Sequence, residues 1–266
     1  MNNKSKIGVF DSGIGGMKIA CAIYDSTYSS DIYYFADQAF SPYGDLSEKV
    51  ILERCDYIVQ KLLERGVEQV VVACNSATAV AIEHLRNRFS IPFVGVEPDL
   101  NFLKRNNISQ NQRVGVITTP VTPKMEKFQL LKAKRDPQGS FDYLAMPQLA
   151  RLVEKLFYAF DDEQSAIVSE IKEELNNQIK GTYDYLVLGC THYGLIDQLI
   201  QDHLGIKTIC PSKAIADRSI SLLNLKDKES AKVGELFFQT SAGEENNFKK
   251  LDLSWKERFK SENLMS

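Results

Sequence analysis

Two cysteines that follow apolar segments are the residues of this sequence best placed to do chemistry. Cys74 lies in VVVACNSATA (Val70–Ala79) and Cys190 in YLVLGCTH (Tyr185–His192), 116 positions further along the chain. Each segment reads as a buried strand that ends in a cysteine and small polar residues before a helical pattern. Ligands of α/β proteins bind beyond the carboxyl ends of strands, where helix N–H groups attract anions. The two segments therefore predict a site made by two related halves.

A thiolate can act as a nucleophile, a redox group, a metal ligand or a proton acceptor. The sequence lacks the other ligands of a metal site and a resolving cysteine close to either thiol, and nucleophilic catalysis would leave one cysteine unexplained. Two thiols on opposite sides of a tetrahedral carbon suit another task, in which one removes a proton and the other delivers one. This favours a two-base racemisation. Cysteines are often merely buried, but the polar neighbours of these two favour a functional role.

The segments around the cysteines include other residues whose interpretation stays open or structural. Asp11–Gly16 could cradle an anion or simply form a tight turn, because it lacks the spacing of a dinucleotide-binding or P-loop motif. Cys21 and Cys55 occupy apolar positions of helical patterns and are expected in the core. His84 is expected to be a solvated or packed helical residue.

Strand and helix patterns alternate through two successive stretches of the chain. Arg113–Pro120 echoes Lys6–Gly13 at an offset of 107 positions, close to the offset between the cysteines. This alternation predicts an α/β fold with two pseudo-symmetric domains, each a mostly parallel sheet flanked by helices, and an active site in the cleft between them. Residues 1–98 with 210–266 are expected to form the first domain, and residues 99–209 the second.

The individual elements are expected at the following positions. The strands are Lys6–Phe10, Asp31–Ala36, Val67–Ala73, Pro92–Val96, one from Arg113, Ser140–Met146, Tyr183–Gly189, Ile206–Cys210 and Glu235–Thr240. The helices are Met17–Tyr24, Leu46–Arg65, Ala77–Phe89, Val121–Lys132, one opened by Pro147, residues 161–180, His192–His203, Ser212–Leu223 and a last helix at the end of the chain.

Composition excludes several classes of function. The 266 residues carry a net charge of −3 without a basic stripe, which argues against a nucleic-acid partner. No apolar run approaches the length of a membrane span, and no signal-peptide pattern opens the chain, so we expect a cytoplasmic protein without a membrane partner. Five cysteines without a CxxC pair and three dispersed histidines argue against disulfides and against a metal site.

Several segments resemble the signature segments of the glutamate racemases, in the aspartate/glutamate racemase superfamily. The resemblance covers nearly the whole chain, and CNSAT and GCTHY together are its most specific part. The segments concerned are Asp11–Gly16, Pro42–Gly44, Ala73–Ala79, Ile91–Pro98, Thr119 and Thr122, Pro147–Glu154, Gly189–Tyr193 and Phe237–Thr240.

The resemblance implies a cofactor-independent racemase that interconverts L- and D-glutamate and supplies D-glutamate for peptidoglycan synthesis. It implies that Cys74 abstracts the α-proton of the D-enantiomer and Cys190 that of the L-enantiomer. It further implies that Asp11 and Glu154 or His192 tune proton transfer at the two thiols, with Asp11 assisting Cys74 and His192 assisting Cys190. Relatives of this kind are often homodimers, so a homodimer is expected. The implied substrate-binding residues are Asp11, Ser12, Pro42, Tyr43, Gly44, Cys74, Asn75, Ser76, Thr119, Thr122, Cys190, Thr191 and His192.

Three positions depart from the usual pattern of these racemases. Ser76 replaces a threonine but keeps the hydroxyl, Gly194 replaces a proline and should loosen a helix start, and Met146 replaces a cysteine in a packing position. Because none of them removes a proposed acid or base, the chemistry should survive. An aspartate or broader amino-acid racemase is the alternative, and a ligand-binding protein without chemistry is a second one.

Overall fold

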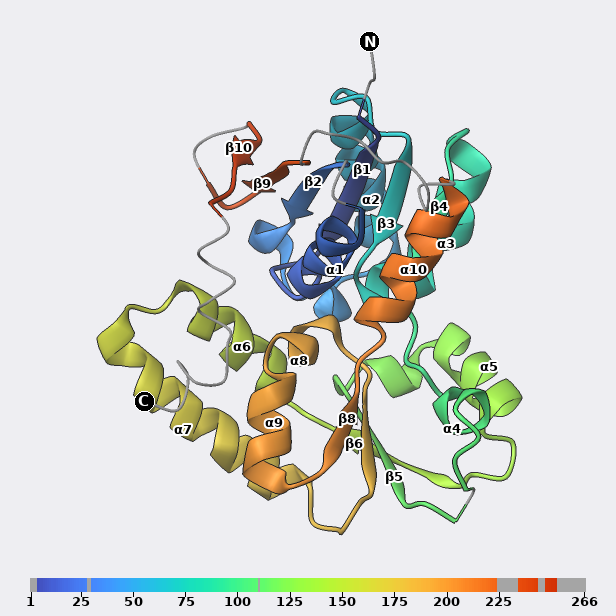
Figure 1. The fold of residues 1–266 in the computed structure, drawn as a ribbon, viewed down its shortest axis with the longest axis vertical. Coiled ribbons are helices and arrows are strands. Elements are labelled where there is room, and N and C mark those ends of the chain that lie inside the picture. Colours follow the sequence, from blue (N-terminus) through green and yellow to red (C-terminus); the bar gives the residue numbers. More distant parts are fainter. Residues whose placement is uncertain (1–3, 28–29, 110, 224–233, 244–246, 253–266) are drawn as a thin grey trace. The chain divides into compact units, whose positions relative to one another are not determined.

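The computed structural model describes residues 4–27, 30–109, 111–223, 234–243 and 247–252 (Figure 1). These residues separate into two compact units, each with its own sheet. The first unit comprises the described residues up to Val96 and from Ser212 to Asp252, and the second runs from Glu97 to Pro211. The last helix expected from the sequence lies outside the described residues.

The first unit contains a six-stranded sheet in the order β10-β9-β2-β1-β3-β4, parallel except for β10 against β9. Its strands are β1 (Lys6–Asp11), β2 (Asp31–Ala36), β3 (Gln69–Val72), β4 (Phe93–Gly95), β9 (Leu236–Thr240) and β10 (Lys249–Lys250). Its helices are α1 (Met17–Thr27), α2 (Glu48–Leu63), α3 (Asn75–Arg88) and α10 (Ser212–Leu222), with 3-10 turns η1 (Gln38–Phe40) and η2 (Tyr43–Asp45).

The core of the first unit follows from the periodicity of its elements. Alternate strand residues such as Phe10 and Val72 pack against the apolar stripe of α2, which includes Ile58 and Leu62. The helices α2 and α3 pack together, as do α1 and α10 (Figure 1). Cys55 is fully buried in this core as expected, whereas Cys21 is only partly buried.

The second unit contains a four-stranded parallel sheet in the order β6-β5-β7-β8. Its strands are β5 (Val114–Thr118), β6 (Phe141–Ala145), β7 (Tyr185–Leu188) and β8 (Lys207–Ile209). Its helices are α4 (Phe102–Arg105), α5 (Glu126–Arg135), α6 (Leu149–Tyr158), α7 (Asp161–Gln178), α8 (Thr191–Leu195) and α9 (Asp197–Leu204), with the 3-10 turn η3 (Thr122–Lys124).

The two sheets repeat one strand arrangement. The order β2-β1-β3-β4 in the first unit corresponds to β6-β5-β7-β8 in the second. Ile7 pairs with Gln69 in one sheet, and their counterparts at the sequence offsets, Val114 and Tyr185, pair in the other. The repeat expected from the sequence is therefore confirmed at the level of strand register, and with it the two-part α/β fold class.

Two expected helices were wrong in extent. His192–His203 is interrupted at Ile196, whose ψ of 23° separates α8 from α9, and Gly194 inside α8 weakens helical continuity. Val121–Lys132 instead forms the turn η3 followed by α5, because Pro123 disfavours a continuous helix through this stretch.

Three smaller differences concern short or weakly patterned segments. The helix expected from Pro147 begins at Leu149. The four-residue helix α4 and the two-residue strand β10 were not expected. Elements this short carry too few residues for a periodic pattern, and the exposed pair of lysines in β10 carries no strand signal at all.

Candidate active site in two halves

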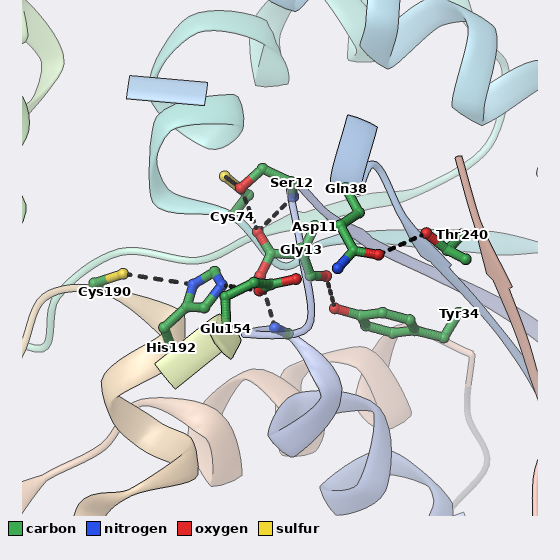
Figure 2. Close-up of polar contacts among 11 residues, drawn as sticks. Asp11, Ser12, Gly13, Tyr34, Gln38, Cys74, Glu154, Cys190, His192 and Thr240 are labelled. Atoms are coloured by element: carbon green, nitrogen blue, oxygen red, sulfur yellow. Dashed lines mark hydrogen bonds and ion pairs between the residues drawn. The ribbon is translucent and has the colours of Figure 1, made fainter. Parts of the chain in front are cut away.

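Cys74 caps the N-terminus of α3. Its backbone is extended, and Sγ accepts a hydrogen bond from the N–H of Ala77 at 3.5 Å. The side chain is 5% exposed, and Sγ lies 3.8 Å from Oγ of Ser12 (Figure 2). Burial first, and the charge of Asp11 second, raise the pKa of the Cys74 thiol well above its ordinary 9.0, against smaller opposing hydrogen bonds. At neutral pH Cys74 is therefore a thiol.

Asp11 ends β1 and turns its carboxylate toward the backbone of the next turn. Its two oxygens each accept an N–H at 2.7 Å, one from Ser12 and one from Gly16. Oγ of Ser12 also lies 3.3 Å from Asp11 Oδ1, so this hydroxyl stands between the carboxylate and the Cys74 thiol. A Cβ on Gly16 would lie only 2.6 Å from Cβ of Ala73. The glycine is thus required for the close approach that holds Asp11.

A buried charge network supports the segment Pro42–Gly44. Asp37 is fully buried and accepts two hydrogen bonds from the guanidinium of Arg54, at 2.9 and 2.7 Å. The hydroxyl of Tyr43 donates to the same carboxylate at 2.5 Å. Burial, followed by the neighbouring charge of Asp37, raises the pKa of Tyr43 above its ordinary value. Tyr43 is 1% exposed, so its side chain anchors the segment in the core. Only the backbone of Pro42–Gly44 is then available to bind a substrate.

In the second unit Cys190 stands at the N-cap of α8, next to a histidine–glutamate pair. Nδ1 of His192 lies 3.8 Å from Cys190 Sγ, and Nε2 of the same ring lies 2.7 Å from Oε2 of Glu154 on α6 (Figure 2). His192 is 5% exposed. A carboxylate on one ring nitrogen fixes the orientation of the imidazole and leaves the other nitrogen to exchange a proton with the thiol.

The remaining residues expected at the site lie in the loops and first helical turns around the cysteines. Asn75 and Ser76 open α3, and Thr191 opens α8. Thr122 is buried, and its hydroxyl lies 2.9 Å from the hydroxyl of Thr119, just beyond the end of β5. Hydroxyls and N–H groups at the starts of helices suit the binding of carboxylates.

The two halves obtain their carboxylate from different elements. Asp11 ends β1, where it pairs with Ala36, whereas Thr118 ends β5, where it pairs with Ala145. Thr118 is fully buried, and its hydroxyl has no hydrogen-bond partner among the described residues. The second carboxylate, Glu154, comes instead from α6. The two units thus repeat the strands and the cysteines, but their carboxylates, Asp11 and Glu154, come from non-equivalent elements.

Sequence reasoning missed several residues that support the first half. The hydroxyl of Tyr34 donates to the carbonyl of Gly13 at 2.7 Å and so holds the turn after Asp11 (Figure 2). Asp37 directly follows the expected strand Asp31–Ala36, and Arg54 lies inside the expected helix Leu46–Arg65, and neither was assigned a role. A buried acidic residue at a strand end needs a cation as a partner. The sequence does not show that Asp37 is buried, so it does not predict the pairing with Arg54.

Among the described residues, no group of three or more histidine, cysteine, aspartate or glutamate side chains is arranged to hold a metal ion. None of the described helices is long and apolar enough to cross a membrane.

Comparison with known proteins identifies the family. The family model described as Asp/Glu/Hydantoin racemase matches residues 40–218. A glutamate racemase of Aliarcobacter butzleri is 36% identical over 237 residues, which cover 87% of this chain and 88% of the relative. A glutamate racemase of Aquifex pyrophilus is 35% identical over 238 residues, which cover 88% of each of the two chains. The crystal structure of Escherichia coli glutamate racemase with L-glutamate and the activator UDP-MurNAc-ala has a TM-score of 0.76 at 30% identity, covering 89% of each chain. This chain belongs to the Asp/Glu/hydantoin racemase family.

Proposed function

We propose that the protein interconverts L- and D-glutamate by a two-base mechanism without a cofactor. The observation that carries the proposal is the equivalence of Cys74 and Cys190, each two positions beyond a central strand and each at a helix N-cap. Each thiol also has its own route to a carboxylate, through Ser12 in one half and His192 in the other. The similarity to glutamate racemases supports the choice of substrate.

In the proposed reaction one cysteine, as a thiolate, takes the α-proton, and the C–H electron pair passes into the α-carbon and its carboxylate. The other cysteine, as a thiol, then donates its proton to the opposite face. Cys74 deprotonates D-glutamate and Cys190 deprotonates L-glutamate. The resting thiol form of Cys74 suits donation, and removal of its proton through Ser12 toward Asp11 prepares it for abstraction.

The developing carbanion is the difficult species, because an α-proton next to a carboxylate is very weakly acidic. Oriented N–H groups and hydroxyls stabilise such charge without reorganisation. The proposed substrate-binding groups are the side chains of Ser12, Asn75, Ser76, Thr119, Thr122 and Thr191 together with the backbone of Pro42, Tyr43 and Gly44.

A chiral assay of the purified chain tests the proposal. L-glutamate should become a racemic mixture without added pyridoxal phosphate, and Cys74→Ala and Cys190→Ala should each abolish the conversion. Wild-type-like turnover in either variant would contradict the two-thiol mechanism. Tight binding of glutamate without turnover by the wild type would instead favour a binding protein.

A substrate panel decides between glutamate and the alternative substrate, aspartate. The two differ by one methylene, which a fitted site discriminates by roughly 10- to 200-fold. A preference for aspartate would redirect the assignment within the same family. Three further predictions depend on glutamate being the substrate. They are that the protein supplies D-glutamate for peptidoglycan synthesis, that it is located in the cytoplasm and that it forms a homodimer.

A further inference from the structure

We propose that Gln38 is a further substrate-binding residue, whose carboxamide N–H groups donate to a carboxylate oxygen of the substrate. The inference rests on the proposed racemisation of glutamate and adds a residue to its first half-site. Gln38 lies in η1, directly after the buried Asp37, and none of the interpretations drawn from the sequence included it.

The register of the first sheet places Gln38 at the edge that carries Asp11. Ala36 pairs with Asp11 on one side and with Thr240 on the other, so β1, β2 and β9 end together. The N–H of Asp37 then donates to the carbonyl of Asp11 at 2.9 Å, which joins the start of the next loop to the end of β1. Gln38 follows immediately. Its side chain therefore leaves the sheet at the same edge as the Asp11 carboxylate.

A hydrogen-bond chain fixes which end of the carboxamide faces which way. The Thr240 hydroxyl oxygen accepts the N–H of Ala242 at 3.2 Å, and the hydroxyl donates to Oε1 of Gln38 at 3.1 Å. With Oε1 at the Thr240 hydroxyl, the amide nitrogen of Gln38 occupies the other position. Figure 2 shows this nitrogen on the side of the turn that contains Asp11 and Gly13.

The nitrogen so directed is available to a ligand. Among the residues that the structure describes, Nε2 of Gln38 has no protein acceptor, while Oε1 is held by Thr240. The side chain is partly buried, so a bound carboxylate would meet an oriented donor at low entropic cost.

Steady-state kinetics and calorimetric titration with glutamate test the proposal together. Gln38→Met keeps the length of the side chain but removes the C=O and the NH2 of the carboxamide. It should raise KM and Kd by roughly 10- to 100-fold, as expected for loss of a hydrogen bond to a charged acceptor. The turnover number should change far less. Gln38→Glu should raise KM further, because it places a negative charge against the substrate carboxylate.

Variants of Thr240 test whether orientation of the amide matters. Thr240→Val keeps the shape but removes the hydroxyl, and should raise KM several-fold, while Thr240→Ser should restore it. Ser241→Ala is the matched control, because the Ser241 hydroxyl follows the same strand end but accepts the backbone N–H of Ala39, at 3.0 Å. An equal KM effect from Ser241→Ala would overturn the orienting role of Thr240.

The outcomes separate this inference from the proposed function. If the wild type racemises glutamate and Gln38→Met leaves KM and Kd unchanged, the role of Gln38 is wrong and the racemase assignment stands. If the wild type binds glutamate without racemising it and Gln38→Met weakens binding, the binding role stands and the proposed reaction is wrong. Failure of the wild type to bind glutamate would overturn both.

Discussion

Nε2 of His192 lies 2.7 Å from Oε2 of Glu154, and this contact turns the other ring nitrogen toward Cys190. In the first half the thiol of Cys74 is linked to the carboxylate of Asp11 through the hydroxyl of Ser12 instead of an imidazole. An imidazole can hold a full proton near neutral pH, whereas a hydroxyl can only relay one. The two thiols are thus equivalent in position but are served by unlike groups.

This asymmetry predicts an asymmetric effect of Glu154→Gln. The glutamine loses the negative charge that orients and supports the His192 ring, so proton transfer at Cys190 should slow by roughly 10- to 100-fold, within the usual range for acid–base assistance. Since the equilibrium constant between enantiomers is unity, kcat/KM must fall equally in both directions.

The asymmetry of Glu154→Gln should appear in isotope effects. The α-deuterium effect on kcat/KM should increase for L-glutamate, whose hydrogen passes through the slowed step, and decrease for D-glutamate. Asp11→Asn is the matched variant, and it should give the opposite pair of changes. Identical isotope effects for both enantiomers in both variants would contradict the assignment of one base to each enantiomer.

The raised pKa of Cys74 predicts slow alkylation near neutral pH. Because only the thiolate reacts, the labelling rate of Cys74 should rise about tenfold per pH unit between pH 7 and 9 without a plateau. Site-resolved mass spectrometry after iodoacetamide treatment measures this rate. A plateau below pH 8 would show that the thiol ionises at least as readily as an exposed cysteine.

Two neighbours should shift the labelling of Cys74 in opposite directions. Asp11→Asn removes a charge that raises the pKa, so labelling at a fixed pH should accelerate. Ser12→Ala removes a hydrogen bond that lowers it, so labelling should slow. Acceleration in both variants would indicate that greater exposure of the thiol, rather than charge, controls its reactivity.

The buried pair of Asp37 and Arg54 predicts a large stability effect. Arg54→Met leaves a fully buried carboxylate without its cation and should lower the free energy of unfolding by about 3–5 kcal/mol. The double variant Asp37→Asn/Arg54→Met should recover much of this loss, because the buried charge is gone. Urea denaturation measures both, and a double variant no more stable than Arg54→Met would argue against the buried charge as the cause.

Gly16→Ala should create a steric clash with Ala73 that a second substitution, Ala73→Gly, can partly remove. The new Cβ would lie 2.6 Å from Cβ of Ala73, which should cost about 1–3 kcal/mol of stability and displace the N–H that holds Asp11. Adding Ala73→Gly removes the closest contact and should restore part of both stability and activity. No recovery in the double variant would place the conflict elsewhere.

The sequence predicted the elements that carry long, regular patterns. The strand ends that bear Cys74 and Cys190, and the offset between the two repeats, were readable because buried parallel strands are continuous apolar runs. Ser12 follows the end of β1 and His192 follows Cys190 by two positions, and the resemblance to glutamate racemases, rather than the strand pattern, implied their roles. The unexpected break at Ile196 arises where local helix strength, lowered by Gly194, yields to tertiary packing.

Residues that support the site from a distance were not predictable in this way. Arg54 meets Asp37 across 17 positions, and Thr240 meets Gln38 across 202. Such pairs depend on which strands become neighbours in the sheet, here β9 beside β2, and no local period encodes that adjacency. Burial of Asp37, which makes a cation necessary, is likewise a property of the assembled fold.

Isotope incorporation in deuterated water tests the two-base claim most directly. Wild-type protein is given undeuterated L-glutamate in D2O, and both enantiomers are analysed by mass spectrometry during the first few per cent of conversion. Transfer between two thiols predicts that D-glutamate carries deuterium at the α-carbon while the remaining L-glutamate keeps its hydrogen. D-glutamate that retains the original hydrogen, or early deuterium in both enantiomers alike, would show a single base and contradict the account.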